Sequence, residues 1–250
     1  MMRVRILALA VLASAAFSCS AVAQGTKLWT VSRYDEMERG TTNGVAIRSD
    51  GQMEAGPATS LLYETGVNYA WSIAADASGN AYVGQGGTAA GGAIVTRVGR
   101  DGKAAKAFEG KELGVQALRL GSDGHIYAAT SPDGKVYRLG SKPGEEAVVF
   151  DAATTAEKPK YLWDVAQAAG SKDLYVAAGA PAIVYRVPAG GGKPEVAFRT
   201  VDQHIRCLLM APDGTLWAGS DGSGVIYRFD TKTPGAKPFA VYSAAKREIT

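Results

Sequence analysis

Short apolar runs separated by glycine- and aspartate-containing turns make up most of this chain. One arrangement recurs four times: an apolar run, a turn, and a second apolar run that carries an aromatic residue. The four copies occupy residues 70–84, 115–129, 162–178 and 205–219. Turns such as Ser-Asp-Gly and Pro-Asp-Gly are typical of β-hairpins, because glycine supplies the positive φ that other residues resist. The runs are apolar on both faces, so the pattern predicts strands that are buried on both sides.

Two further runs follow each of these segments. The aromatic residue of the second run recurs every 42 to 48 residues, at Tyr82, Tyr127, Tyr175 and Trp217. The third run ends near an arginine, namely Arg97, Arg138, Arg186 or Arg228, and a fourth run carries a phenylalanine. Four strands at a period in the low forties are typical of one blade of a β-propeller. The sequence therefore predicts an all-β propeller with four-stranded blades at 68–112, 113–160, 161–203 and 204–248.

Both ends of this repeat array are irregular. Residues 44–56 and 60–66 resemble part of a blade, so we expect a shortened first blade within 24–67. The last residues, Lys-Arg-Glu-Ile-Thr, stand where the innermost strand of a further repeat would begin. These features favour an N-terminal portion of a longer propeller over a closed ring of five blades. An open arc of blades leaves two apolar faces uncovered, so we expect residues 24–250 alone to self-associate.

The recurrent Tyr-Arg element with its Asp-Gly turn resembles secreted bacterial β-propeller proteins, which are related in pattern to WD-repeat and YVTN-type propellers. The resemblance covers residues 44–250 and implies an architecture, not an activity. WD-repeat blades usually carry Gly-His and Trp-Asp punctuation. Here only Trp163-Asp164 has that form, at the start of a strand instead of its end.

The N-terminus has the pattern of an export signal. Arg3 and Arg5 precede an apolar run of about a dozen residues, which is too short to span a bilayer as a helix. Small residues precede Gln24, so we expect residues 1–23 to be removed and the mature protein to be periplasmic or secreted. Cys19 is a rival lipid-acceptor position, but the residues before it fit a lipoprotein signal poorly. The pattern favours the soluble exported form.

Composition adds little to this picture of function. The formal net charge is +3, so the chain has no electrostatic reason to bind nucleic acid. Glycine accounts for 31 of 250 residues, which suits many tight turns. After signal removal Cys207 is the one remaining cysteine, so no internal disulfide is expected. Its apolar surroundings predict a buried, inert thiol.

Candidate site residues are those that differ between repeats at one position. Where the chain enters each innermost strand, the four repeats carry Trp71, Gln116, Trp163 and Arg206, and Asp164 and His204 lie close by in the sequence. Aromatic faces stack on sugars or peptides, and charged groups orient them, so these six residues form a candidate ligand-binding rim. The alternative is that Trp71 and Trp163 pack between blades and His204 caps a loop.

The four arginines of the third run are interpreted as structural, because a residue present in every repeat is more simply a packing device. We expect each guanidinium to bind backbone carbonyls or the turn aspartate of the adjacent blade.

No catalytic set is apparent. The chain has two histidines and lacks a Gly-x-Ser-x-Gly elbow, and no metal or cofactor is expected. The sequence thus predicts an exported, non-catalytic module that binds a protein, peptide or carbohydrate, or serves as a scaffold. The alternative is a metal-assisted hydrolase or lactonase that uses Asp164 and Asn68 at the central channel.

We expect the exported protein to begin at Gln24, because the small residues that signal peptidase requires precede that bond. Intact-mass analysis of the periplasmic or secreted protein checks this. Retention of residues 1–23 contradicts the expectation, and a lipid mass on Cys19 indicates the lipoprotein instead.

Overall fold

The computed structural model describes residues 30–250, except 38, 57–58, 88–91, 169 and 190. The expected signal segment 1–23, Cys19 included, lies outside the described residues. The chain divides into two units, one ending at Ser60 and the other running from Leu61 to Thr250.

The first unit contains the short helix α2 (Tyr34–Met37) and one antiparallel hairpin, formed by β1 (Val45–Ile47) and β2 (Met53–Ala55). Gly51, in the connecting turn, has a φ of 81°, a conformation that favours glycine. Among the described residues β1 and β2 pair only with each other. Residues 60–66 form no strand, so β1 and β2 are the strands found in the described part of the segment that the sequence assigns to a shortened blade.

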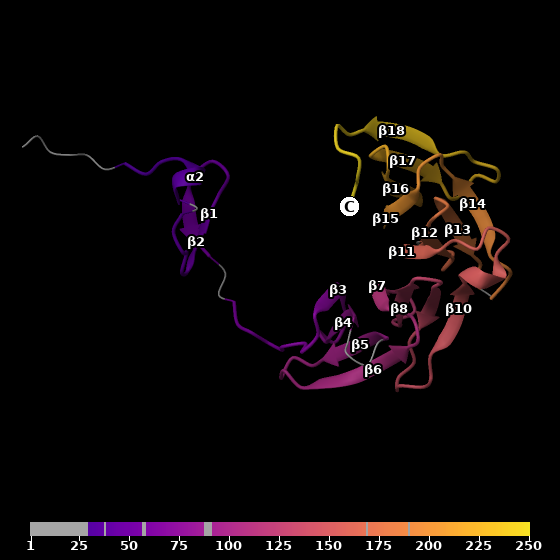
Figure 1. Cartoon of the computed structure of the whole chain (residues 1–250), viewed down its shortest axis with the longest axis horizontal. Helices are drawn as coiled ribbons and strands as arrows, with labels where there is room; N and C mark the ends of the chain where they lie inside the picture. Colours follow the sequence, from indigo (N-terminus) through magenta and orange to yellow (C-terminus); the bar gives the residue numbers. More distant parts are fainter. Residues whose placement is uncertain (1–29, 38, 57–58, 88–91, 169, 190) are drawn as a thin grey trace, which may run out of the picture. The chain divides into compact units, whose positions relative to one another are not determined.

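The second unit contains two eight-stranded antiparallel sheets, and each of them is made of two groups of four consecutive strands that pair in order (Figure 1). Each group of four strands is called a blade here. Blade 1 contains β3 (Tyr69–Ala75), β4 (Ala81–Gly86), β5 (Ala93–Val98) and β6 (Ala104–Gly110). Blade 2 contains β7 (Gly114–Leu120), β8 (Ile126–Ser131), β9 (Lys135–Arg138) and β10 (Ala147–Asp151), followed by the 3-10 turn η1 (Ala152–Thr154). Blade 3 contains β11 (Tyr161–Gln167), β12 (Leu174–Gly179), β13 (Ile183–Val187) and β14 (Glu195–Arg199). Blade 4 contains β15 (His204–Met210), β16 (Thr215–Asp221), β17 (Val225–Asp230) and β18 (Phe239–Ser243).

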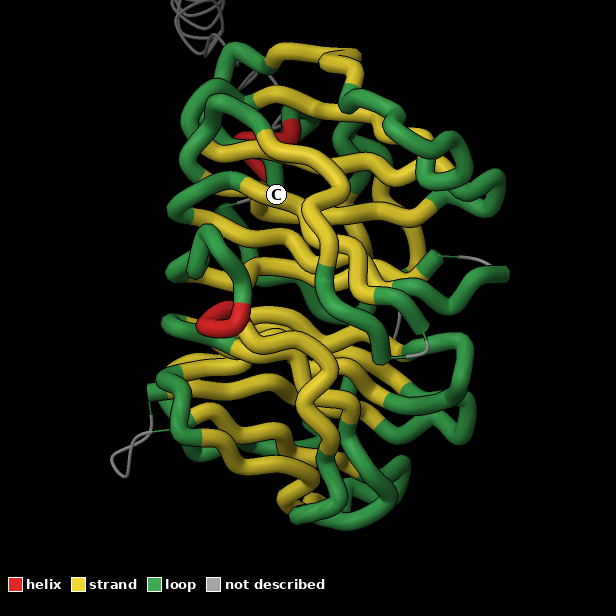
Figure 2. Tube along the Cα trace, turned by 90° about the vertical axis from the view of Figure 1, so that its right-hand side faces the viewer, coloured by secondary structure: helices red, strands yellow, loops and turns green. Residues whose placement is uncertain are grey.

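The blades of this unit follow one another along an arc, with β3, β7, β11 and β15 on its inner side (Figure 1). Strand and loop account for nearly all of the described chain, so the all-β prediction is confirmed (Figure 2). Apolar side chains fill the space between successive blades. Between blades 2 and 3, for example, Phe150 and Tyr185 pack with their ring centroids 5.2 Å apart. β8 and β12 are buried along their whole length, because each lies inside a blade that has a neighbour on both faces.

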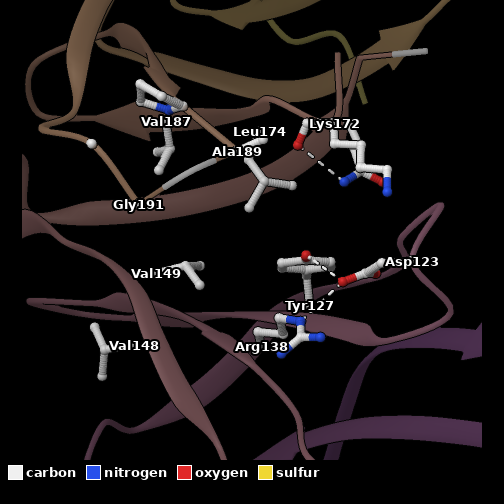
Figure 3. Close-up of a pocket in the computed structure, with 13 residues that line it drawn as sticks. Asp123, Tyr127, Arg138, Val148, Val149, Lys172, Leu174, Val187, Ala189 and Gly191 are labelled. Atoms are coloured by element: carbon white, nitrogen blue, oxygen red, sulfur yellow. Dashed lines mark hydrogen bonds and ion pairs between the residues drawn. The ribbon is translucent and has the colours of Figure 1, made fainter. Parts of the chain in front are cut away.

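The third-strand arginine lies directly opposite the second-strand aromatic residue in every blade. The cross-strand pairs are Tyr82–Arg97, Tyr127–Arg138, Tyr175–Arg186 and Trp217–Arg228. In blade 2, Arg138 Nε donates to Asp123 Oδ2 at 2.9 Å and Tyr127 donates to the same oxygen at 3.0 Å (Figure 3). In blade 3, Arg186 donates to Asp173 at 2.7 Å.

For Arg138 and Arg186, the expectation that the guanidinium binds backbone carbonyls or the turn aspartate of the adjacent blade is wrong. Asp123 and Asp173 lie in the turn between the first and second strands of the same blade as their arginine. The antiparallel register explains this, because it brings the end of the third strand beside that turn. In blade 4 the guanidinium of Arg228 lies 5.8 Å from the ring centroid of Phe239.

A second recurring bond ties blades 2, 3 and 4 to the loops that lead into them. The hydroxyl of the third-strand tyrosine donates to an acidic residue just before the innermost strand. The pairs are Tyr137–Glu112 at 3.0 Å, Tyr185–Glu157 at 3.2 Å and Tyr227–Asp202 at 2.8 Å. Burial and the neighbouring carboxylate raise the pKa of Tyr227 to about 12, so its hydroxyl stays a donor at physiological pH.

The C-terminal residues continue the repeat. Gly87 and Ala180 donate backbone hydrogen bonds to the residue that precedes the innermost strand of the next blade, and Gly222 donates in the same way to Arg247. Asp221 then pairs with Glu248 as Gly179 pairs with His204. Residues 247–250 therefore occupy the place of an innermost strand beside blade 4.

We expect Tyr185→Phe to lower the free energy of unfolding by about 1–2 kcal/mol, because it removes a hydrogen bond to a charged acceptor without changing the packed ring. Denaturant unfolding measures the change. Tyr242→Phe, at an exposed position on β18, is the control and should shift stability by less than about 0.5 kcal/mol. Equal stability of the Tyr185 variant and the native chain contradicts the assigned role of this bond.

Candidate functional site

The four variable residues at the entrances of the innermost strands share one backbone feature. Trp71, Gln116, Trp163 and Arg206 are each the extra residue of a β-bulge, where the pairing with the second strand shifts by one. A bulge leaves its extra residue unpaired and redirects its side chain. The sequence repeat thus located a backbone irregularity that recurs in all four blades.

These bulges bring residues of all four blades to one cleft, with a volume of about 550 Å³. Five of the six expected rim residues line it: Trp71, Gln116, Trp163, Asp164 and Arg206. Arg119 and Thr250 line it as well, although the sequence analysis did not select them. The volume lies in the range of small-molecule sites.

Trp163 is held from several sides. Its ring stacks on Tyr161 with centroids 5.3 Å apart, and the guanidinium carbon of Arg206 lies 3.8 Å from the ring centroid. Its indole Nε1 donates to His204 Nδ1 at 3.1 Å. Gly179 makes this possible, because a Cβ at that position would overlap both His204 and Trp163. Trp163 is therefore a fixed part of the cleft wall.

His204 supports the rim from outside the cleft. Burial lowers the pKa of His204, so the ring is neutral near pH 7 and Nδ1 keeps the lone pair that accepts from Trp163. His204 thus contacts the wall of the cleft through Trp163 and does not line the cleft itself.

Asp164 lies in the floor of the cleft and is only 3% exposed. Its Oδ2 accepts from Arg119 Nη2 and from the backbone N–H of Leu208, both at 2.9 Å, and its Oδ1 accepts from the backbone N–H of Val165 at 2.8 Å. Burial raises the pKa of Asp164, while these donors act in the opposite direction. Both carboxylate oxygens are thus engaged within the protein, so the side chain joins strands and does not present a free oxygen to the cleft.

Trp71 offers the most open aromatic surface of the site. Its side chain is 52% exposed and stacks on Tyr69, with ring centroids 5.2 Å apart and planes inclined by 16°. This exposure does not agree with the alternative that Trp71 is packed between blades. The indole belongs to the first blade of the arc and faces the cleft from one side.

Two arginines supply the positive charge of the cleft. Arg119 is anchored to Asp164, and Arg206 Nε donates to Glu248 Oε1 at 2.9 Å. Arg119 escaped the sequence analysis because it lies three residues beyond the bulge, within an apolar run. A charged residue near the end of a predicted buried strand was the available signal.

Asn68, which the sequence analysis pairs with Asp164 as a possible metal ligand, is not part of the cleft lining. Asn68 is exposed and precedes β3. Within the described residues no cluster of three or more histidine, cysteine or acidic side chains has metal-binding geometry. Burial raises the pKa of Cys207, whose Sγ lies 3.6 Å from the carbonyl oxygen of Ile249, so the thiol stays protonated. In the described part of the chain, no helix has the length and apolarity needed to cross a membrane.

Comparison with solved structures shows the architecture. The chain resembles a virginiamycin B lyase from Staphylococcus aureus in complex with quinupristin, with a TM-score of 0.59 and 15% identity over 74% of this chain and 60% of that one. It also resembles a gluconolactonase from Xanthomonas campestris, with a TM-score of 0.57 and 16% identity over 81% of this chain and 69% of that one.

A third similar structure is a nidogen/laminin complex, with a TM-score of 0.56 and 12% identity over 69% of this chain and 64% of that one. The chain has the β-propeller fold. It spans just over half of another S. aureus virginiamycin B lyase chain that it resembles. No family model and no curated protein sequence matches it.

Proposed function

We propose that the unit Leu61–Thr250 is a ligand-binding module, and that its ligand occupies the cleft between Trp71, Gln116, Trp163 and Arg206. The observation that carries this proposal is the exposed, stacked Trp71–Tyr69 pair at the mouth of a cleft lined by two guanidinium groups. Exposed, preorganised aromatic surface beside orienting polar groups is a usual composition of a small-ligand site.

The rigidity of the surroundings supports binding at this position. Trp163 is fixed by Tyr161, His204 and Arg206, and Arg119 is fixed by Asp164. Side chains that are already ordered lose little conformational entropy when a ligand arrives. A scaffold that merely spaced other proteins would have no need for this arrangement.

We propose further that binding takes place outside the cytoplasm. The N-terminal signal pattern of residues 1–23 supports this location. An exported binding module of this kind would take a carbohydrate, a peptide or part of another protein as its ligand.

The alternative, a metal-assisted hydrolase or lactonase, has less support in the donor geometry. A cation at the channel would need free oxygen ligands, and hard cations such as Ca²⁺ take six to eight of them. The carboxylate of Asp164 instead accepts hydrogen bonds on both oxygens, from Arg119 and two backbone N–H groups, and the residue is 3% exposed.

We expect Trp71→Ala to weaken binding of the ligand by at least about tenfold, because it removes the exposed stacking surface. Panels of immobilised oligosaccharides and peptides would select ligands of the native chain, and calorimetric titration would then compare the variants. Tyr242→Ala is the matched control, since Tyr242 is similarly exposed but lies on β18, away from the cleft lining. Undiminished affinity of the Trp71 variant contradicts the proposed site.

Calcium titration separates the two candidate functions. We expect the native chain to show no saturable calcium binding that depends on Asp164, because both oxygens of Asp164 already accept hydrogen bonds within the protein. The Asp164→Asn variant should therefore titrate like the native chain. A tight calcium site that depends on Asp164 would move the assignment to the hydrolase. Thermal melting of the variant must accompany the titration, since Asp164 also connects strands.

A further inference from the structure

Arg206 carries unused hydrogen-bonding capacity at the cleft. A guanidinium has five N–H donors in a planar fork. Nε donates to Glu248, while the terminal Nη1 and Nη2 have no protein acceptor among the described residues. The group is positioned by its stacking on Trp163, at 3.8 Å, and its side chain is only 27% exposed. A preorganised fork of this kind matches a carboxylate in a bidentate manner.

The balance of charge in the cleft favours an acidic ligand. Asp164 is enclosed by its donors and 3% exposed, so its negative charge is shielded from the cleft. Arg119 and Arg206 both line the cleft, and 48% of the side chain of Arg119 is exposed. Arg206 is paired with the carboxylate of Glu248.

The ion pair of Glu248 with Arg206 shows that this guanidinium binds a carboxylate. Its carboxylate binds Arg206 at 2.9 Å, and its backbone is held by pairing with Asp221. The side chain of Glu248 is 45% exposed, and ion pairs this exposed contribute little stability. A ligand carboxylate can therefore join Glu248 on the free edge of Arg206 or replace it.

The backbone of the cleft argues for a sugar rather than a peptide. Extended peptides commonly bind by adding a strand to a regular sheet edge. All four innermost strands are bulged at the rim, which interrupts the edge that such a peptide would need. Recognition is left to side chains, and the Trp71–Tyr69 pair presents a flat apolar face that suits the apolar face of a pyranose ring.

We propose that the cleft binds an acidic carbohydrate, with a uronic acid carboxylate on the Nη1/Nη2 edge of Arg206 and a sugar ring on Trp71. This rests on the proposed function and adds the ligand class. Glu248 then acts as an internal competitor for the same guanidinium, so the ligand affinity depends on its charge.

Calorimetric titration of the mature full chain with trigalacturonate tests this, with the methyl-esterified trisaccharide as the probe that lacks charge. We expect the acid to bind about tenfold or more tightly than the ester, and Arg206→Gln to remove that difference. Glu248→Gln should raise the affinity for the acid severalfold, because the competing carboxylate is gone. Arg100→Gln, at an exposed position away from the cleft lining, is the control and should bind like the native chain.

The outcomes distinguish the two proposals. Equal binding of acid and ester, with both lost in Trp71→Ala, overturns the acidic preference and leaves the cleft as the binding site. Binding of an acidic peptide such as penta-glutamate but of neither trisaccharide overturns the sugar assignment. If Arg206→Gln fails to melt cooperatively, Glu248→Gln alone decides, and an unchanged affinity in that variant contradicts the competition.

Discussion

The buried carboxylate of Asp164 connects the innermost strands of three consecutive blades. It lies on β11, accepts the guanidinium of Arg119 on β7, and accepts the backbone N–H of Leu208 on β15. A buried carboxylate is stable only when donors compensate its charge, and here two of the three donors come from other blades. At the inner side of the arc this side chain therefore joins blades 2, 3 and 4, which the apolar cores between them also hold together. It forms the floor of the cleft as well.

The β-bulges determine which residues of the innermost strands line the cleft. A regular innermost strand would alternate its side chains between the two faces of the blade. One extra residue at the entrance of each strand breaks the alternation and directs Trp71, Gln116, Trp163 and Arg206 to a common cleft. The bulge thus recurs in every blade, whereas the residue at the bulge differs from blade to blade.

The residues that recur between blades form hydrogen bonds that stabilise each blade. Tyr127, Arg138 and Asp123 close the first hairpin of blade 2 on itself, and Tyr137 ties its third strand to the preceding loop through Glu112. Equivalent bonds hold blade 3. Blade 4 differs, because Trp217 replaces the second-strand tyrosine and Arg228 lies near Phe239 instead. These contacts stay within one blade and its entering loop, so they stabilise each repeat locally and leave the cleft free to vary.

The sequence by itself determined the all-β repeat, the order of four strands in each blade, and the position that varies between blades. Those features follow from local periodicity, turn chemistry and equal spacing, which need no knowledge of distant contacts. Only the tertiary structure decided what the varying residues contact. The sequence predicts Asp164 as a charged residue of the rim, but its carboxylate accepts hydrogen bonds from Arg119 and from the backbone of Leu208. The ring of Trp163 is covered by the guanidinium of Arg206. The contacts of Arg119 with Asp164 and of Glu248 with Arg206 are likewise decided by the tertiary structure. Each of these contacts joins residues more than 40 positions apart, so its partner is set by how the blades pack and by the bulges that turn the side chains.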